Sequence, residues 1–548
     1  MYEAISAIHL QRLRQLEDAF GLGDIETSIA ELSEVLFCST RNVTKVMKKL
    51  HALGLINWVA GRGRGIKSHF SIVVKFEELL TLQVLSKVQA GSLNDAYQFA
   101  ETFHYQGWFR KNLPKWLETY SESNENSDQV IFIVPHALER CHPVDLFDIH
   151  SGLYATVLFD TLINFDPLTD SFTPHLAHQF QKTDFGFAFR IRPNVHFHNG
   201  VLLTPQLVRE HFLKLKDYND LYRQLLASIE SIEVNRQWVE IRMRYDDPML
   251  LHLLSDVHFS VILNNEIEEG FPIGTGSYSW DTRNESSWSL VKNERYFGVH
   301  GILSRADFWR LDSAEAQLNP YVIRYESINT PKSFSSEDIP INGCNALCFH
   351  QRLPKNMRKV LVYLFKHKIK RAPNTSKNPC TTLIGYGEAL ELKALTPLSD
   401  EQIVESLEFT TLRYFVEDSG VLHSALEHLN HLGIETIPVN SIEAADFWVG
   451  DYSFGNNVTL GQYYWLLCSD YAQLMLPVTT IQRWRNQMLL SQSLPDFFYQ
   501  LEQHCIDEYR VLPLWRKSTR YNCHSSIRGH RPNNFGLFNL AEIWLDKR

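Results

Sequence analysis

A short segment near the N-terminus is strongly basic within an otherwise acidic chain. Residues 41–75 contain eight Lys and Arg side chains and no Asp or Glu, whereas the whole chain has a formal net charge of −10. Residues 1–115 hold 14 Lys and Arg against 11 Asp and Glu, which leaves 39 against 52 for the remainder. Because cations that neutralise phosphates release condensed counterions, this pattern favours nucleic-acid binding by the N-terminal part alone.

Two predicted helices position these cations. Ser28 and Glu31 form a Ser-x-x-Glu capping box, which opens a short helix over residues 29–37. After a short turn, residues 41–53 have the period of a second helix, and Gly54 ends it. Apolar residues of the second helix recur on one face, so its basic side chains lie mostly on the face left for solvent or a partner.

A hairpin with a basic tip is predicted after the second helix. Residues 55–59 and 69–74 read as β-strands, and the Gly-Arg-Gly-Arg-Gly run at residues 61–65 joins them. Helix, turn, helix and basic hairpin in this order predict a winged helix-turn-helix, in which one helix enters the DNA major groove and the wing grips the flanking DNA. The predicted DNA-binding residues are Arg41, Thr44, Lys45, Lys48, Arg62, Arg64 and Lys67.

Two other interpretations of the basic segment compete with DNA binding. The glycine run could be a phosphate-cradling nucleotide loop, but it lacks the Lys-Ser/Thr ending and no helix opens at its end. A basic stretch can also be a solvated face, but the absence of acidic residues and the helix-hairpin context argue against that. We therefore expect double-stranded DNA as a partner.

Length and composition bound the class of protein. A chain of 548 residues is too long to fold around a single hydrophobic core, so roughly two to four domains are expected. Eight cysteines without a Cys-x-x-Cys pair indicate neither a zinc site nor a disulfide framework. The N-terminus lacks the apolar run of an export signal, and no apolar stretch approaches the roughly 20 residues that cross a bilayer, so we expect a cytoplasmic protein without a membrane partner.

The pattern along the chain divides it into three segments. Residues 1–118 are predicted to form the α+β winged helix with a helical extension, and residues 119–128 a polar linker. Residues 129–548 alternate strands and helices with Gly- and Pro-marked turns, which suits an α/β domain of more than one lobe. The expected fold class is therefore multidomain, a winged helix followed by an α/β domain.

Motifs in the third segment resemble the family 5 extracellular solute-binding proteins, which feed peptide and nickel ABC transporters. The first group is Phe159-Asp160-Thr161-Leu162, Pro174-His175-Leu176-Ala177, Ile191-Arg192-Pro193-Asn194-Val195 and Phe197-His198-Asn199-Gly200. The second group is Pro272-Ile273-Gly274-Thr275-Gly276-Ser277-Tyr278, Lys292-Asn293-Glu294 and Tyr296-Phe297-Gly298. This resemblance implies a two-lobed, type II periplasmic-binding-protein-like fold that closes on a ligand.

The N-terminal part, with Ala60-Gly61-Arg62-Gly63-Arg64-Gly65, is similar to the DNA-binding domain of the SgrR regulators. Arg483-Trp484-Arg485-Asn486 and Val511-Leu512-Pro513-Leu514 resemble the same family, so the match covers nearly the full length. The resemblance implies a cytoplasmic transcription factor that pairs a winged helix with a sensor of a small metabolite, a sugar phosphate or similar compound. Its further partner would be the transcription machinery.

The predicted ligand-binding residues come from two places late in the chain. Trp448, Asp451 and Tyr452 occupy the position at which the solute-binding family has the end of a cleft-lining strand, although Trp448 as core and Asp451 as a turn residue is an equal alternative. Trp515 and Arg516 follow a predicted strand, and they offer an aromatic wall and a guanidinium suited to bidentate phosphate contact.

No catalytic or metal-binding residues are predicted. His423, Glu427, His428 and His431 have spacings that mimic a metal site, but the 23 histidines of the chain make chance clusters common, and an exposed helix face explains them. The chain has no nucleophile elbow, Walker loop or zinc-protease helix. Neither a cofactor nor enzymatic activity is expected.

The sequence thus predicts a ligand-responsive transcription regulator. One alternative is a transport-associated peptide- or solute-binding protein of an ABC transporter, and a second is an enzyme that acts on a sugar phosphate or peptide. The missing export signal and the basic helix argue against the first alternative. Turnover of a bound compound would distinguish the second.

Overall fold

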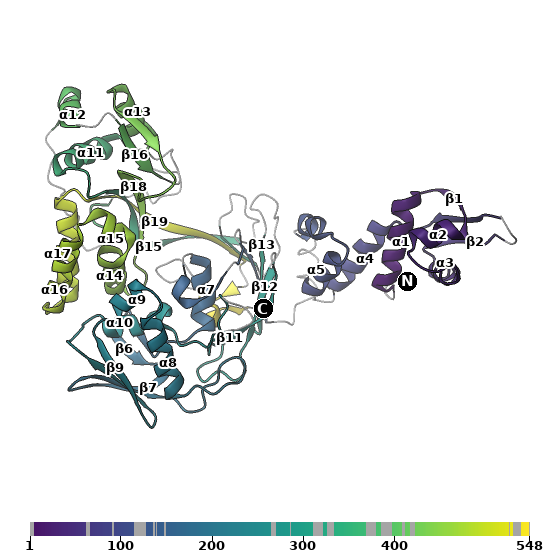
Figure 1. Ribbon diagram of the computed structural model, residues 1–548, viewed down its shortest axis with the longest axis horizontal. Coiled ribbons are helices and arrows are strands. Elements are labelled where there is room, and N and C mark those ends of the chain that lie inside the picture. Colours follow the sequence, from purple (N-terminus) through teal and green to yellow (C-terminus); the bar gives the residue numbers. More distant parts are fainter. Residues whose placement is uncertain are drawn as a thin grey trace.

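The computed structural model consists of a small N-terminal unit, residues 5–113, and a larger C-terminal unit, residues 128–546 (Figure 1). Within these bounds the structure describes residues 5–61, 66–89, 93–113, 128–134, 137–138, 140–146, 149–264, 270–284, 287–310, 322–325, 334–368, 380–384, 397–407, 411–416, 422–524, 527–529 and 539–546. Arg62, Arg64 and nearly all of the predicted linker lie outside the described residues.

The N-terminal unit has the winged-helix order of elements. In chain order it contains α1 (Ala7–Phe20), β1 (Asp24–Thr27), α2 (Ile29–Val35), α3 (Thr40–Ala52), β2 (Ile56–Val59) and β3 (Ser68–Ile72), and its sheet has the order β1-β3-β2. The predicted capping box is present, because Ser28 Oγ accepts the Glu31 N–H and the Glu31 carboxylate accepts the Ser28 N–H. The structure confirms the predicted helices and hairpin within a few residues and adds α1 and β1.

A helical extension follows the winged helix. It consists of α4 (Phe76–Gln89), α5 (Leu93–Glu101) and a further helical segment at residues 106–113. The extension and the winged helix share one hydrophobic core, to which α3 contributes Val43, Met47 and Leu50. Figure 1 shows α5 nearest to the C-terminal unit, and α2, α3 and β2 at the far end.

A ten-stranded mixed sheet runs through the C-terminal unit. Its strands, in spatial order, are β11 (Tyr278–Arg283), β12 (Ser287–Lys292), β13 (Arg305–Arg310), β4 (Gln129–Val134), β14 (Val322–Tyr325), β19 (Val511–His524), β15 (Phe334–Phe349), β18 (Phe447–Ser453), β16 (Thr411–Phe415) and β17 (Glu435–Pro438). The long antiparallel strands β15 and β19 join the two ends of this sheet. The ends form two lobes, as the resemblance to solute-binding proteins implied (Figure 1).

Lobe I contains the β11 end of the sheet and the segment between β4 and β11. A second sheet has the order β7 (Ala177–Thr183), β8 (Gly186–Ile191), β10 (Trp238–Met243) and β9 (Ile229–Asn235), and β5 (Ile163–Asp166) pairs with β6 (Ser171–Pro174). The helices and turns are η1 (Pro143–Asp145), α7 (Ile149–Leu158), α8 (Pro205–Lys216), α9 (Asp220–Leu225), α10 (Leu250–Leu254) and η2 (Val257–Phe259). Thr204 caps α8, since its Oγ1 accepts the Leu207 N–H at 3.2 Å. The C-terminal end of the chain adds β20 (Ile527–Arg528), η5 (Leu540–Glu542) and β21 (Trp544–Leu545).

Lobe II surrounds β18, β16 and β17 with helices. They are α11 (Lys355–Lys368), α12 (Asp400–Ser406), α13 (His423–His431), α14 (Val458–Tyr463), the π-helical turn η4 (Tyr464–Cys468), α15 (Asp470–Met475), α16 (Val478–Leu489) and α17 (Leu494–Asp507). The lobes meet at α10 and α14, where His252 Nδ1 lies 3.0 Å from Asn457 Oδ1. Among the described residues, no helix has the length and apolar character needed to span a bilayer.

Candidate functional site

The exposed face of α3 carries most of the described cations that the sequence assigns to DNA. Arg41, Lys45 and Lys48 are exposed, and Thr44 is half-buried beside them. The opposite face of the helix is fully buried, so these side chains cannot turn inward. Within the described part of the chain, no carboxylate lies within 4.0 Å of the three cations, which leaves their charges available to a partner.

The base of the wing is a close approach of two backbone segments. Strands β2 and β3 pair from Ile56 opposite Ile72 to Val59 opposite His69. A Cβ at Gly61 would lie 2.4 Å from the carbonyl oxygen of Ile66, so a glycine is required there. Lys67 is exposed at this base, next to the tip segment that holds Arg62 and Arg64 outside the described residues.

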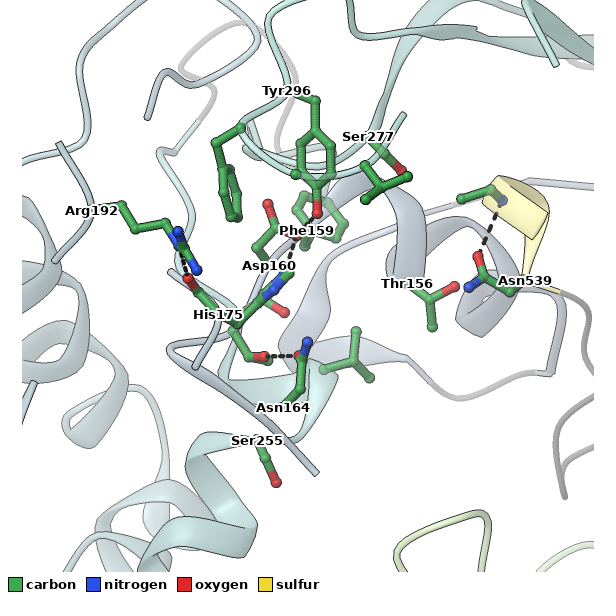
Figure 2. A pocket seen from close by; sticks show the side chains of 17 residues that line it. Thr156, Phe159, Asp160, Asn164, His175, Arg192, Ser255, Ser277, Tyr296 and Asn539 are labelled. Carbon is green, nitrogen blue, oxygen red and sulfur yellow. Dashed lines mark hydrogen bonds and ion pairs between the residues drawn. The ribbon is translucent and has the colours of Figure 1, made fainter. Parts of the chain in front are cut away.

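Lobe I contains a cavity of about 670 Å³ beside the C-terminal end of α7 (Figure 2). All of its lining residues belong to lobe I or to the C-terminal segment. They are Thr156, Phe159, Asp160, Thr161, Asn164, His175, Arg192, Ser255, Val257, Ser260, Ser277, Tyr296, Phe297, Gly298, Val299, Asn539 and Ala541. The lining mixes aromatic and aliphatic side chains with hydroxyl, amide and charged groups, which is typical of a small-molecule site.

A buried carboxylate organises one wall of the cavity. Asp160 is only 4% exposed, and Thr275 Oγ1 and Tyr296 Oη donate hydrogen bonds to it at 2.7 and 3.1 Å. His175 Nε2 lies 2.8 Å from the same carboxylate (Figure 2). Burial, together with the Asp160 charge, raises the pKa of Tyr296, so its hydroxyl keeps its proton and remains a donor. The carboxylate is therefore a fixed acceptor that holds together the three loops containing Thr275, Tyr296 and His175.

The cavity also joins motifs that lie far apart in the sequence. The Gly276 N–H donates to the Leu158 carbonyl at the end of α7, and Asn293 Nδ2 donates to the Gly276 carbonyl. His198 Nε2 lies 3.1 Å from that same carbonyl, and burial lowers the pKa of His198. A Cβ at Gly274 or Gly276 would lie within about 2.1 Å of a backbone oxygen at residues 157–158, so both glycines are needed for the close approach.

Arg192 supplies a positive charge at the edge of the cavity. Its Nε donates to the His175 carbonyl at 2.5 Å, and its guanidinium lies over the Phe297 ring, 5.5 Å from the centroid. No carboxylate of the described residues lies within 4.0 Å of it, so it has no ion-pair partner there. Figure 2 shows Arg192 beside His175 in the cavity lining, where a guanidinium is suited to binding an anion.

The five predicted ligand-binding residues lie elsewhere, and none of them lines this cavity. On β18, Trp448 and Tyr452 are fully buried and pack on Tyr471 of α15, whereas Asp451 points to the other side of the strand and is exposed. Trp515 on β19 is buried in the core of lobe II. These residues belong to two neighbours of β15, and their role in ligand binding stays a prediction.

Arg516 is half-buried and has partners within the protein. Its guanidinium donates to the carbonyls of Gly343 and Leu383 and to the hydroxyl of Thr382, at 3.2, 2.6 and 2.9 Å. These bonds fix the segment at residues 380–384 against β15 and β19. Glu502 of α17 contributes to the same arrangement, because its Oε1 accepts the Leu383 N–H at 2.7 Å.

Glu502 gives a testable pH dependence of stability. It is 1% exposed, and burial raises its pKa from 4.5 to about 7. Between these two pH values the folded protein holds a proton that the unfolded chain has lost, so stability falls as the pH rises from about 4.5 to 7. Glu502→Gln keeps the Oε1 acceptor without titrating. Its stability relative to the wild type should therefore rise by up to roughly 3 kcal/mol between pH 5 and pH 8.

Thermal unfolding of lobe II in the full chain, followed across this pH range, measures the effect. Glu405→Gln, on an exposed position of α12, is the control and should follow the wild type at every pH. If Glu502→Gln shows the same pH dependence as the wild type, the buried carboxyl does not titrate in this range.

The histidines of α13 have carboxylate neighbours. His423 Nε2 lies 3.0 Å from Glu427, and His428 Nε2 lies 3.2 Å from Asp400. In the residues that the structure describes, no group of three or more His, Cys, Asp or Glu side chains is arranged to hold a metal ion.

The cavity residues were visible in the sequence only as motifs. Asp160, His175, Arg192 and Tyr296 all fall within the segments that resemble solute-binding proteins, but they were not predicted as site residues. The resemblance could have identified the segments, whereas their meeting at one cavity depends on contacts across as many as 136 residues.

Two family models match the chain. Residues 9–121 match the N-terminal domain of the sugar transport-related sRNA regulator, and residues 171–325 match the bacterial extracellular solute-binding proteins, family 5. These ranges fall on the N-terminal unit and on lobe I.

Curated relatives match over nearly the whole chain. The HTH-type transcriptional regulator SgrR of Yersinia pestis is 22% identical, and the alignment covers 95% of each protein. The uncharacterized protein YhjP of Bacillus subtilis is 23% identical over 95% of this chain and 96% of its own.

Solved structures match the C-terminal part of the chain. The periplasmic binding protein DppA of Helicobacter pylori, in complex with the peptide STSA, has a TM-score of 0.61 at 12% identity, over 76% of this chain and 98% of its own. NikA of Staphylococcus aureus, in complex with Ni(L-His)2, has a TM-score of 0.59 at 14% identity, over 76% of this chain and 99% of its own. These similarities show the two-lobed solute-binding fold.

Proposed function

Because the chain belongs to the SgrR family, with a regulator-type N-terminal domain fused to a family 5 solute-binding-like domain, we propose that it is a DNA-binding transcription regulator that senses a small metabolite. The observation that carries the proposal is the winged helix with an exposed basic face on α3, joined in one chain to a lobe with a polar cavity. The alternative of a transport protein fits less well, because residues 9–121 match the regulator domain.

DNA binding is proposed to use α3 and the wing. Arg41, Thr44, Lys45 and Lys48 face outward at helical spacing, so the helix can enter a major groove with its cations near both backbones. Lys67 and the wing arginines, Arg62 and Arg64, would contact flanking phosphates. The protein would act in the cytoplasm, with residues 1–118 as the DNA-binding domain and residues 129–548 as the sensor.

The sensor is proposed to bind a sugar phosphate or a similar small anion in the cavity of lobe I. Arg192 would take the phosphate, because a guanidinium matches it with two parallel hydrogen bonds. Asn164, Ser277 and Asn539 line the cavity and can bond sugar hydroxyls. A volume of about 670 Å³ suits a ligand of this size.

The experiment is thermal unfolding of the full chain with a panel of hexose phosphates, each compared with the free hexose and with inorganic phosphate. A ligand at about 100 times its dissociation constant adds roughly 2.7 kcal/mol to the folded state, which raises the unfolding temperature of the sensor. Free hexoses should give a smaller shift. The absence of any shift across the panel would contradict a sugar-phosphate sensor.

Asp451→Ala separates the cavity from the site predicted in the sequence. Asp451 is exposed. If the ligand binds near the five predicted residues, Trp448, Asp451, Tyr452, Trp515 and Arg516, the substitution should remove the rise in unfolding temperature that hexose phosphate causes. If it binds in the lobe I cavity, the shift should remain.

A further inference from the structure

Strand β13 departs from the usual pattern of a sheet with one solvated face. Ala306 and Phe308 point into the core of lobe I, and Arg305 and Asp307 point to the opposite face. Trp309 is two residues after Asp307 and so lies on the same outer face of the strand. In a sheet with one solvated face, side chains at such positions are usually polar. Trp309 is nevertheless only 1% exposed. Something other than lobe I covers this indole.

The cover is the helical extension of the N-terminal unit. The Trp309 ring stacks on Phe109 with centroids 5.8 Å apart and an interplanar angle of 28°. Tyr97 of α5 meets the same indole edge-on at 5.9 Å and 70°, and it also contacts Phe109 at 5.4 Å. Ile131, on the adjacent strand β4, is 4% exposed and belongs to the same apolar cluster. These two side chains join the core of the N-terminal unit.

A polar network borders this apolar contact on the sheet. Arg305 donates to Asp307 through Nε at 2.9 Å, to Asp281 through Nη1 at 2.7 Å and to Ser289 through Nη2 at 2.8 Å. Each of its three nitrogens has a fixed acceptor, which holds β11, β12 and β13 together as a rigid surface. The N-terminal unit therefore rests on a surface that moves with lobe I.

The inner face of the same strand leads to the cavity. Phe308 contacts Tyr154 of α7 edge-on at 4.8 Å, and Trp288 also packs on that tyrosine. Two residues after Tyr154, α7 reaches the cavity with Thr156, and Phe159 and Asp160 line it directly after the helix ends. The strand that holds Trp309 on one face thus holds, through Phe308 on the other face, the helix whose end lines the cavity.

We propose that Trp309 docks the N-terminal unit on lobe I, and that this junction transmits the state of the cavity to the DNA-binding face. The docking stands by itself, whereas the transmission rests on the proposed function. A ligand that prefers one position of α7 shifts Phe308 and β13, and this changes the angle at which Trp309 presents α5 and the winged helix. The ligand can change DNA affinity by no more than the ratio of its own affinities for the two arrangements.

The docking is tested without any ligand. Small-angle X-ray scattering of the full chain should show a larger radius of gyration and a more extended distance distribution for Trp309→Ala than for the wild type. Trp238→Ala is the matched control, because it removes a half-buried indole from β10 of the same lobe, and it should leave the scattering unchanged. Identical scattering of Trp309→Ala and the wild type overturns the docking.

The coupling is tested by DNA affinity with and without hexose phosphate, with hexose phosphate affinity measured on the same samples. In the wild type, typical coupling would change DNA affinity by roughly 5- to 150-fold. In Trp309→Ala, hexose phosphate should change DNA affinity by less than about twofold, while the affinity for hexose phosphate itself is retained. Trp309→Phe should restore part of the effect of hexose phosphate on DNA affinity. Tyr97→Ala, on the other side of the contact, should have the same effect and replaces Trp309→Ala if that variant does not fold.

The possible failures are distinguishable. Full coupling in both Trp309→Ala and Tyr97→Ala overturns the transmission through this junction and leaves the proposed function standing. If the wild type binds no hexose phosphate, the proposed ligand is wrong and the transmission falls with it, while the scattering result still decides the docking.

Discussion

The double substitution Lys45→Ala/Lys48→Ala should weaken DNA binding by the full chain by roughly 10- to 100-fold at 0.1 M salt. Both lysines are exposed on the outer face of α3 and have no acidic neighbour in the described residues. Each phosphate contact contributes about 0.9 to the slope of log affinity against log salt, so the loss of two contacts lowers that slope by about 1.8. Fluorescence anisotropy of a labelled duplex over a salt series measures both quantities.

Lys111→Ala is the matched control for this prediction. It removes the same charge from an exposed position in the helical extension, away from α3. Its affinity and salt slope should equal those of the wild type. An unchanged slope in the double variant, or an equal loss in Lys111→Ala, would remove α3 from the DNA interface.

Arg192→Gln should weaken binding of the hexose phosphate that stabilises the wild type by roughly 10- to 150-fold. A hydrogen bond to a charged group contributes about 1.5–3 kcal/mol, and Gln retains a donor of similar length without the charge. Binding of the corresponding free hexose should change little, because only the phosphate contact is lost. Titration calorimetry with both compounds measures the difference.

Arg209→Gln provides a close control for Arg192→Gln. Arg209 of α8 also donates its Nε to a backbone carbonyl, that of Ile232 at 2.8 Å, but it does not line the cavity. Its substitution should leave hexose phosphate affinity unchanged. Equal losses in the two variants would show a general weakening of lobe I instead of a direct phosphate contact.

Local features of the fold could be predicted from the sequence because their causes are local. The capping box at Ser28, the proline-started helix after Thr204 and the stop at Gly54 each depend on residues within one or two turns. The exposed side of α3 followed from its periodicity. Helix α1 was not predicted, although Leu10, Leu13 and Leu16 recur at helical spacing and are buried on one face.

The candidate site depends on long-range contacts that the sequence does not encode locally. Alternation along β18 places Trp448 and Tyr452 on one face and Asp451 on the other, but the pattern alone does not tell which face meets a cleft. The structure places the two aromatic side chains against α15. In lobe I, Asp160 meets Tyr296 because two loops and the end of α7 converge, which no spacing rule predicts.

The most direct test of a ligand-responsive regulator is the DNA affinity of the wild-type full chain with and without a saturating hexose phosphate. The duplex would be one that the protein itself selects from a random pool, and binding of the hexose phosphate would be verified by calorimetry in the same buffer. We predict that the dissociation constant for DNA changes by roughly 5- to 150-fold. An identical dissociation constant with the sugar phosphate bound would contradict the central claim, because the cavity would then have no influence on the DNA-binding face.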